Sequence, residues 1–275
     1  MIATKFETYL GSIKGYSQKT IEGYMKDIHH FARWMKKKNP NARWSTVTRD
    51  DIDEYIIAEV ARGLKPATTN RKLASISALY NYFKREGLEV ANPCKYESRR
   101  KISENVPNTI PTEELKTAYE HATGATKFML GLIMTTGMRI QEVLDMRWEH
   151  IDFMNQCIKI QGKGGKSRLV YTTAEVLKPA SDAQQYGYKR GKMWSIDQRT
   201  ARFMIWEALK PYSNAAQLSP HAIRHTYATN LAANGCNCST LSKILGHKHL
   251  ETTQKYIDMG QQPIKEICQK YALTN

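Results

Sequence analysis

Apolar residues recur at every third or fourth position along most of this 275-residue chain, and this spacing predicts amphipathic helices. The clearest run begins after Ser17, a residue type that caps helix N-termini, and continues to Met35. Residues 36–38 are lysines, placed where the helix dipole favours cations, and Asn39 and Pro40 end the run. The same spacing predicts a helix capped by Thr112 and further helices over residues 48–61, 68–87, 126–136, 140–146, 200–209, 220–234, 238–245, 251–257 and 264–273.

This helical spacing breaks in two places. It disappears over residues 92–111, among prolines and basic residues, so we expect a linker at 96–110 joining domains 1–95 and 111–275. A long surface loop within one domain would give the same pattern. Between residues 157 and 171, alternation around a glycine-rich turn predicts a β-hairpin. We therefore expect a mainly α protein of two domains, the second α-rich with a small antiparallel sheet and with a loop over residues 180–194.

The charge of the chain indicates its kind of partner. Lys and Arg number 41 against 26 Asp and Glu, a net charge of +15. Residues 1–105 hold 20 basic and 12 acidic side chains, and the remainder hold 21 and 14, so the excess is spread over the whole chain. The mutual repulsion of these positive charges favours a polyanionic partner. Binding to nucleic acid explains the excess charge better than a merely basic surface does.

Membrane and secreted classes fit the sequence poorly. No run of about 18 apolar residues exists, and the first ten residues carry Lys5 and Glu7, so we expect a cytoplasmic (or nuclear) protein without a membrane partner. The odd number of five cysteines argues against a disulfide framework. Cys236 and Cys238 are too close in sequence for an ordinary zinc knuckle.

Two local clusters in the second half carry basic residues at turns. Gly137 can end one helix and leave Arg139 at the start of the next, where an anion can be bound. Lys163 lies in the glycine-rich tip of the predicted hairpin. That tip is not a Walker phosphate loop, because Ile160 stands where such a loop has its first glycine. Taken alone, the motif is better explained as a basic hairpin that touches DNA phosphates without chemistry.

Two further clusters combine histidines with other polar residues. Ser219 and Pro220 suit a helix start, which places His221, Arg224 and His225 on one helix face. Farther along the chain, His247 and His249 precede Tyr256. A metal site is the alternative, but an arginine among the histidines and the lack of a carboxylate or thiol set argue against it. Together the four clusters suit attack on a phosphodiester without a metal.

The order of these residues resembles a known family. Arg139, Lys163, His221-x-x-Arg224, His247 and Tyr256 together are similar to the signature of tyrosine recombinases, the phage integrase family, and especially its Xer-like branch. The strings that carry the resemblance are TTGMRIQEVLDMRWEHID, IQGKGGKSRLV, HAIRHTYATNLAANG and LSKILGHKHLETTQKYI. The resemblance implies a SAM-like core-binding domain over residues 1–95 and a catalytic domain over 111–275.

The resemblance also implies a mechanism. Tyr256 would attack a DNA phosphate, form a 3′-phosphotyrosyl link and release a 5′-hydroxyl, while Arg139, Arg224 and His247 stabilise the transition state. Lys163 would protonate the leaving oxygen, and His221 would assist proton transfer at the tyrosine. Glu142 and His225 would support these groups without reacting. Neither metal, ATP nor another cofactor is needed, because the covalent intermediate keeps the bond energy.

The expected partner is duplex DNA with a specific recombination site. Four protomers would exchange strands through a Holliday junction, accessory DNA-binding proteins would assist, and residues 264–273 would dock on a neighbour or on their own domain. DNA contacts are expected from six basic residues: Lys72, Arg99, Arg100, Lys101, Lys166 and Arg168.

Three other functions remain open from the sequence. A type IB topoisomerase shares the chemistry, although the Xer-like spacing disfavours it. A DNA-binding regulator is suggested by residues 231–245, which resemble a helix-turn-helix around Gly235 but leave Lys163 and Tyr256 without a role. An inactive accessory relative is disfavoured by the complete residue set. Integration, inversion and dimer resolution are not separated by these residues.

Overall fold

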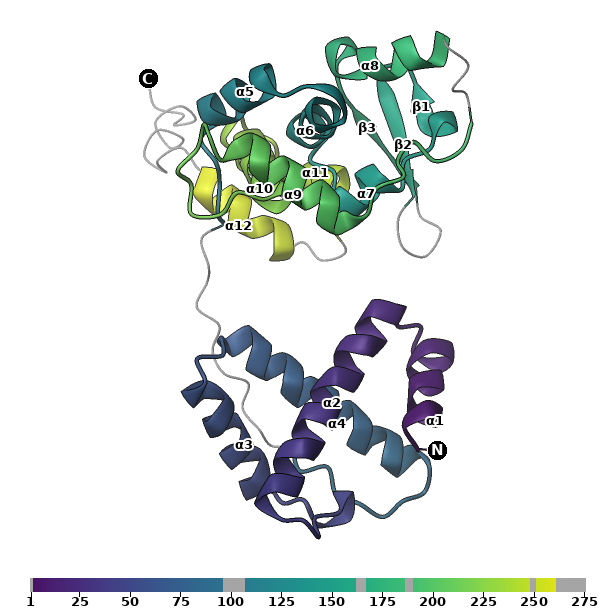
Figure 1. Ribbon diagram of the computed structural model, residues 1–275, viewed down its shortest axis with the longest axis vertical. Coiled ribbons are helices and arrows are strands. Elements are labelled where there is room, and N and C mark those ends of the chain that lie inside the picture. The colour runs from purple at the N-terminus through teal and green to yellow at the C-terminus, as the bar shows by residue number, and fades with distance from the viewer. Residues whose placement is uncertain (1, 96–106, 162–166, 186–189, 248–250, 261–275) are drawn as a thin grey trace, which may run out of the picture. The chain divides into compact units, whose positions relative to one another are not determined.

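The structure, a computed structural model, describes residues 2–95, 107–161, 167–185, 190–247 and 251–260. It divides into two compact units, residues 1–105 and 106–275, and each is described by itself (Figure 1). Among the residues described, no helix is long and apolar enough to span a membrane.

The N-terminal unit is a bundle of helices. Its elements are α1 (Ile2–Thr8), a π-helical turn (Tyr9–Ile13), α2 (Gln18–Lys38), a 3-10 turn (Trp44–Thr46), α3 (Arg49–Ala61) and α4 (Pro66–Arg85). The Ser17 hydroxyl accepts a hydrogen bond from the Thr20 amide, which confirms it as the cap of α2. The α2 helix packs against α4, and the core between the helices is rich in aromatic side chains. Phe31, Tyr55 and Tyr80 are fully buried there.

Lys72 of α4 lies inside this unit, and the expectation that it contacts DNA is wrong. The residue is 6% exposed, and its ammonium lies 2.8 Å from the Glu59 carboxylate and donates to the Tyr55 hydroxyl at 3.2 Å. Glu59 is itself buried and also pairs with Arg62. The charge of Lys72 therefore balances a buried carboxylate and is not presented to a phosphate.

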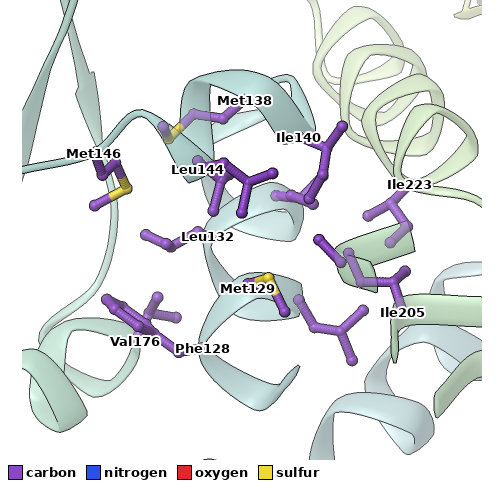
Figure 2. Close-up of a cluster of buried hydrophobic side chains, with 14 of the residues drawn as sticks. Phe128, Met129, Leu132, Met138, Ile140, Leu144, Met146, Val176, Ile205 and Ile223 are labelled. Carbon is purple, nitrogen blue, oxygen red and sulfur yellow. The ribbon is translucent and has the colours of Figure 1, made fainter. Parts of the chain in front are cut away.

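The C-terminal unit surrounds a second core. Its helices are α5 (Thr112–His121), α6 (Gly124–Thr136), α7 (Ile140–Leu144), α8 (Ala174–Gln185), α9 (Gln198–Leu209), α10 (Pro220–Ala233), α11 (Cys238–Leu245) and α12 (Glu251–Gly260). A 3-10 turn (Trp148–His150) precedes the first strand. Figure 2 shows apolar side chains of α6, α7, α8, α9 and α10 meeting in this core. Met129 and Leu132 of α6 are wholly buried within it.

A three-stranded antiparallel sheet lies at one side of this unit. Its strands are β1 (Ile151–Asp152), β2 (Cys157–Gln161) and β3 (Ser167–Tyr171), hydrogen-bonded in that order. Ile158 pairs with Val170, and both side chains are buried. The predicted hairpin is confirmed, as is the mainly α fold with a small antiparallel sheet.

Several boundaries differ from the sequence-based expectations. The α1 helix, α8 and β1 were not expected, and α8 includes residues 180–185 of the expected loop. Thr112 is the first residue of α5, and Pro111 stands at the cap position. Ile110, expected in the linker, is buried in the C-terminal unit and exchanges hydrogen bonds with the Thr226 hydroxyl. Residues 264–273 and most of the linker lie outside the described residues.

Candidate active site

Arg224 lies at the centre of the candidate site. The α10 helix starts as predicted, with the Ser219 hydroxyl accepting from the Ala222 amide and Pro220 at its first position. Arg224 follows one turn later and is 1% exposed. Its guanidinium donates to the Gly137 carbonyl at 2.5 Å and to the Leu245 carbonyl at 2.7 Å. Burial, with the neighbouring Arg139 charge, lowers the pKa of Arg224 to about 10, so it stays cationic at neutral pH.

The two carbonyls that hold Arg224 belong to helix C-termini. Gly137 ends α6 and Gly246 ends α11, both in the left-handed backbone region, with φ of 63° and 64°. A side chain at Gly137 would also clash, because its Cβ would lie 2.5 Å from Cδ1 of Tyr227. Helix C-termini carry partial negative charge, so both ends are suited to a buried cation.

Arg139 and Glu142 form the second part of the site. Glu142 accepts from the Arg139 amide at 2.8 Å and from its guanidinium at 3.1 Å, which fixes the start of α7. The Arg139 guanidinium also donates to the Leu245 carbonyl at 3.3 Å, beside Arg224. The Arg139 side chain is 41% exposed, so it can reach a ligand.

Arg168 of β3 supports Glu142, and the expectation that Arg168 contacts DNA is not supported. Its guanidinium donates to both carboxylate oxygens, at 3.0 and 2.8 Å, and to the Ile244 carbonyl at 2.9 Å. Burial opposes ionisation of Glu142, but the hydrogen bonds from Arg168 and Arg139 outweigh it and lower the pKa of Glu142. The supporting role of Glu142 in catalysis stays a prediction.

His247 joins the cluster through Arg224. Its Nε2 lies 3.0 Å from the Arg224 guanidinium and its Nδ1 lies 2.8 Å from the Thr253 hydroxyl. Since a guanidinium can only donate, Nε2 accepts, and in the neutral ring Nδ1 then carries the proton and donates to Thr253. Thr253 is fully buried in α12 and was not identified from the sequence. The feature of the sequence that could have identified Thr253 is its position six residues after His247.

Tyr256 lies on α12, which packs against α10. The tyrosine is 2% exposed, and its hydroxyl lies 2.6 Å from Nδ1 of His225. Burial raises the pKa of Tyr256, against the opposing charges of Arg224 and Arg139. Sequence reasoning assigned the proton-transfer role to His221, but it is His225 that contacts the hydroxyl in this structure. His221 is exposed, and its ring lies edge-on to that of His225 at 4.4 Å.

A cleft of about 530 Å³ lies next to these groups. Its lining is formed by Arg139, Ile140, Gln141, Gln198, Arg202, Ser219, Pro220, His221 and Arg224. Gln198 and Arg202 of α9 were not identified from the sequence. Lys163, Lys166, Arg99, Arg100 and Lys101 lie outside the described residues, so their roles stay predictions. In the part of the chain that the structure describes, no group of three His, Cys, Asp or Glu side chains is suited to hold a metal ion.

Comparisons with known proteins identify the family. Residues 108–262 match the phage integrase family, and residues 3–87 match the phage integrase N-terminal SAM-like domain. Tyrosine recombinase XerC of Bacillus pumilus is 27% identical over 285 residues, covering 95% of this chain and 92% of the relative. Tyrosine recombinase XerD of Oceanobacillus iheyensis is 25% identical, with coverage of 97% and 96%.

Solved structures show the same fold. XerH site-specific recombinase bound to a palindromic difH substrate aligns with a TM-score of 0.77 at 19% identity, covering 97% of this chain and 84% of that one. A lambda integrase dimer bound to a COC′ core site aligns with a TM-score of 0.71 at 17% identity, covering 95% and 77%. The chain therefore belongs to the phage integrase family. Within it, the chain is a Xer-like tyrosine recombinase, an enzyme of site-specific recombination that acts on DNA.

Proposed function

We propose that this recombinase cuts and rejoins duplex DNA through a 3′-phosphotyrosyl link to Tyr256. One observation carries the proposal: the buried Tyr256 hydroxyl is hydrogen-bonded to a histidine, and two arginine charges act on it. A regulator that only binds DNA has no use for a tyrosine placed in this way. Arg139 and Arg224 both donate to the Leu245 carbonyl, and His247 contacts Arg224. These three side chains supply the cationic and polar groups that a phosphodiester requires.

Each group has a proposed role in the cleavage step. The Tyr256 oxygen bonds to phosphorus and the bond from phosphorus to the 5′ oxygen breaks. Arg139, Arg224 and His247 bind the non-bridging oxygens, where negative charge develops. Lys163 protonates the leaving 5′ oxygen, and His221, which lines the cleft and lies edge-on to His225, assists proton transfer at the tyrosine through the His225 ring. The phosphotyrosyl bond retains the energy needed for rejoining, so no cofactor is required.

The assembly follows from the resemblance to known recombinases. We propose a specific recombination site in duplex DNA, four protomers at the crossover and a Holliday junction between two rounds of strand exchange. The two aligned structures contain a difH substrate and a COC′ core site, which supports a DNA site as the substrate of this chain. Assistance by accessory DNA-binding proteins and a cytoplasmic location stay predictions from the sequence.

The test uses nicked duplexes from the DNA that flanks the gene, incubated with protein in EDTA and separated on a denaturing gel. We expect a shifted protein–DNA band with the unaltered protein and none with Tyr256→Phe. Tyr171→Phe is the matched control, because Tyr171 is 66% exposed on β3, and it should give the band. If no band forms, repeating the reaction on random genomic fragments shows whether the flanking DNA lacked the recombination site or the protein does not cleave DNA.

The alternatives predict different outcomes. Adduct formation on any duplex, with relaxation of supercoils by a monomer, would favour the topoisomerase. Tight binding by both proteins without an adduct on any fragment would favour the regulator. The proposal requires an adduct that depends on Tyr256 and on a particular DNA site.

A further inference from the structure

The hydrogen bond between Tyr256 and His225 raises the question of where the tyrosine proton goes during cleavage. The hydroxyl and Nδ1 are 2.6 Å apart, and the two residues are 2% and 9% exposed. Water therefore has little access to the phenol. A proton that leaves this oxygen needs an acceptor in the protein or on the DNA.

The direction of this hydrogen bond depends on the tautomer of His225. Burial raises the pKa of Tyr256, so the phenol keeps its proton near neutral pH, and it donates to His225 in the tautomer whose Nδ1 carries no hydrogen. Arg224 and Arg139 favour the phenolate, and so assist once the proton begins to move. Tyr256 therefore combines a bound proton with cations that would stabilise its loss.

His247, the other histidine beside the tyrosine, is not placed to accept this proton. Its ring stacks near Tyr256 at 6.3 Å, but Nε2 faces the Arg224 guanidinium and Nδ1 faces the Thr253 hydroxyl. The His221 ring lies edge-on to the ring of His225, which is the hydrogen-bond partner of Tyr256. His225 is thus placed, through its Nδ1, in hydrogen-bond contact with the reacting oxygen.

We propose that His225 is a catalytic residue of this recombinase, whose Nδ1 takes the Tyr256 proton as the phenolic oxygen bonds to the scissile phosphorus. The inference rests on the proposed phosphotyrosyl mechanism. In cleavage, one O–P bond forms at Tyr256 and the P–O5′ bond breaks; the phenol proton moves to His225, and the 5′ oxygen takes a proton from Lys163. Rejoining reverses each transfer, so His225 returns its proton as Tyr256 leaves.

The experiment compares His225→Asn and His225→Ala on two nicked substrates. Asparagine offers an amide oxygen near the position of Nδ1, so it keeps a hydrogen-bond acceptor that cannot be protonated. One substrate has an ordinary scissile phosphate, and the other has sulfur in place of the bridging 5′ oxygen. A thiolate leaves without a proton, so the second substrate bypasses the acid and retains the need for a base.

We expect both variants to cleave either substrate about a hundred- to ten-thousandfold more slowly, while binding DNA as the unaltered protein does. Lys163→Ala is the reference for loss of the acid. It should cleave the substrate with the ordinary scissile phosphate slowly and the sulfur-substituted substrate normally. His121→Asn is the matched control, because this exposed histidine on α5 is also held through Nδ1, by the Thr117 carbonyl. It should cleave normally.

Two results would overturn the inference. Cleavage by His225→Asn at a rate within about threefold of normal would show that His225 only positions Tyr256. Normal cleavage of the sulfur-substituted substrate by both variants would show that His225 acts as the acid for the leaving group and not as the base. If His225→Ala does not fold, His225→Asn alone decides. Failure of the phosphotyrosyl mechanism itself looks different, because then the unaltered protein gives no adduct that depends on Tyr256.

Discussion

Arg224 carries its charge at 1% exposure, held by main-chain carbonyls rather than by a close carboxylate. The nearest oxygen of Glu142 lies 4.0 Å away. Carbonyl dipoles orient a guanidinium and compensate for its lost hydration without cancelling its charge. A carboxylate in contact would have neutralised the site, so this arrangement leaves a preorganised positive charge for an anion.

Glu142 is the residue whose removal should cost the most stability around the site. Glu142→Gln leaves Arg168, 16% exposed, with a neutral partner, and we expect the free energy of unfolding to fall by about 3 kcal/mol. Urea unfolding measures it. The matched control is Glu113→Gln, whose exposed pair with Lys116 should contribute under about 1 kcal/mol. Equal losses in the two variants would contradict this account.

The contribution of Glu142 should also depend on pH. Its pKa is lowered in the folded state, from an ordinary value of 4.5, so folding favours the ionised form. That stabilisation is fully present above the unfolded pKa and is lost as the pH falls through the folded value. The stability difference between the unaltered protein and Glu142→Gln should therefore be constant near neutral pH and shrink below about pH 4.5. Urea unfolding at several pH values tests it, and a difference that grows in acid would be evidence against the ion pair.

At the scale of elements, the ends of α6 and α11 build the site. Each helix finishes in a left-handed glycine, which turns the chain away and leaves carbonyls directed at Arg224. The start of α7 adds Arg139 beside them. Three helix termini thus converge on one position, although each is unremarkable alone.

Two glycines have similar backbone angles, so comparing their alanine variants separates the cost of backbone strain from the cost of a steric clash. Gly124 and Gly137 have φ of 54° and 63°, but a Cβ at Gly124 meets nothing within 4 Å. Gly124→Ala should cost about 1 kcal/mol of unfolding free energy from backbone strain alone. Gly137→Ala should cost about 1–3 kcal/mol more, since its Cβ runs into Tyr227. Similar losses on urea unfolding would show that the contact with Tyr227 relaxes freely.

The buried pair between α3 and α4 gives another prediction. Lys72→Met leaves Glu59, 1% exposed, without the buried one of its two cations at 2.8 Å and should destabilise the N-terminal unit by about 3 kcal/mol. Adding Glu59→Leu should recover most of that loss, because an apolar pair needs no compensation for lost hydration. Hydrogen exchange of peptides from α3 and α4 reports on this unit. Slow exchange in Lys72→Met alone would show that Arg62 is a sufficient partner.

At the scale of the whole molecule, the net charge of +15 governs binding to DNA of any sequence. We expect log K to fall linearly with log salt, with a slope of about 0.9 per phosphate neutralised. Replacing Arg99, Arg100 and Lys101 by glutamine should reduce that slope, while Lys72→Met should leave it unchanged because Lys72 is buried. Fluorescence anisotropy across a salt series measures it. A binding constant that is flat in salt would contradict the electrostatic argument.

Local signals explain which elements were predictable. The α2 and α11 helices have strong apolar spacing and capping side chains, and both were predicted. The α8 helix was missed because Pro179 lies inside it, which disfavours a helix unless packing compensates. Its Val176, Leu177 and Ala180 are buried in the C-terminal core. The α1 helix was missed for another reason: its burial rests on contacts with residues distant in the sequence, such as that of Phe6 with Tyr82.

The sequence by itself determined the helical fold, the hairpin, the family resemblance and the residue types of an anion site, because these depend on spacing along the chain. Tertiary structure decided which side chains meet. It put Lys72 in a core and Arg168 on Glu142, and it brought His225 to the Tyr256 hydroxyl. Helical spacing places His221 and His225 on one face of α10, but it does not say which of them α12 covers. Only packing of α12 against α10 makes that choice, because contact between distant residues depends on how whole helices fit together.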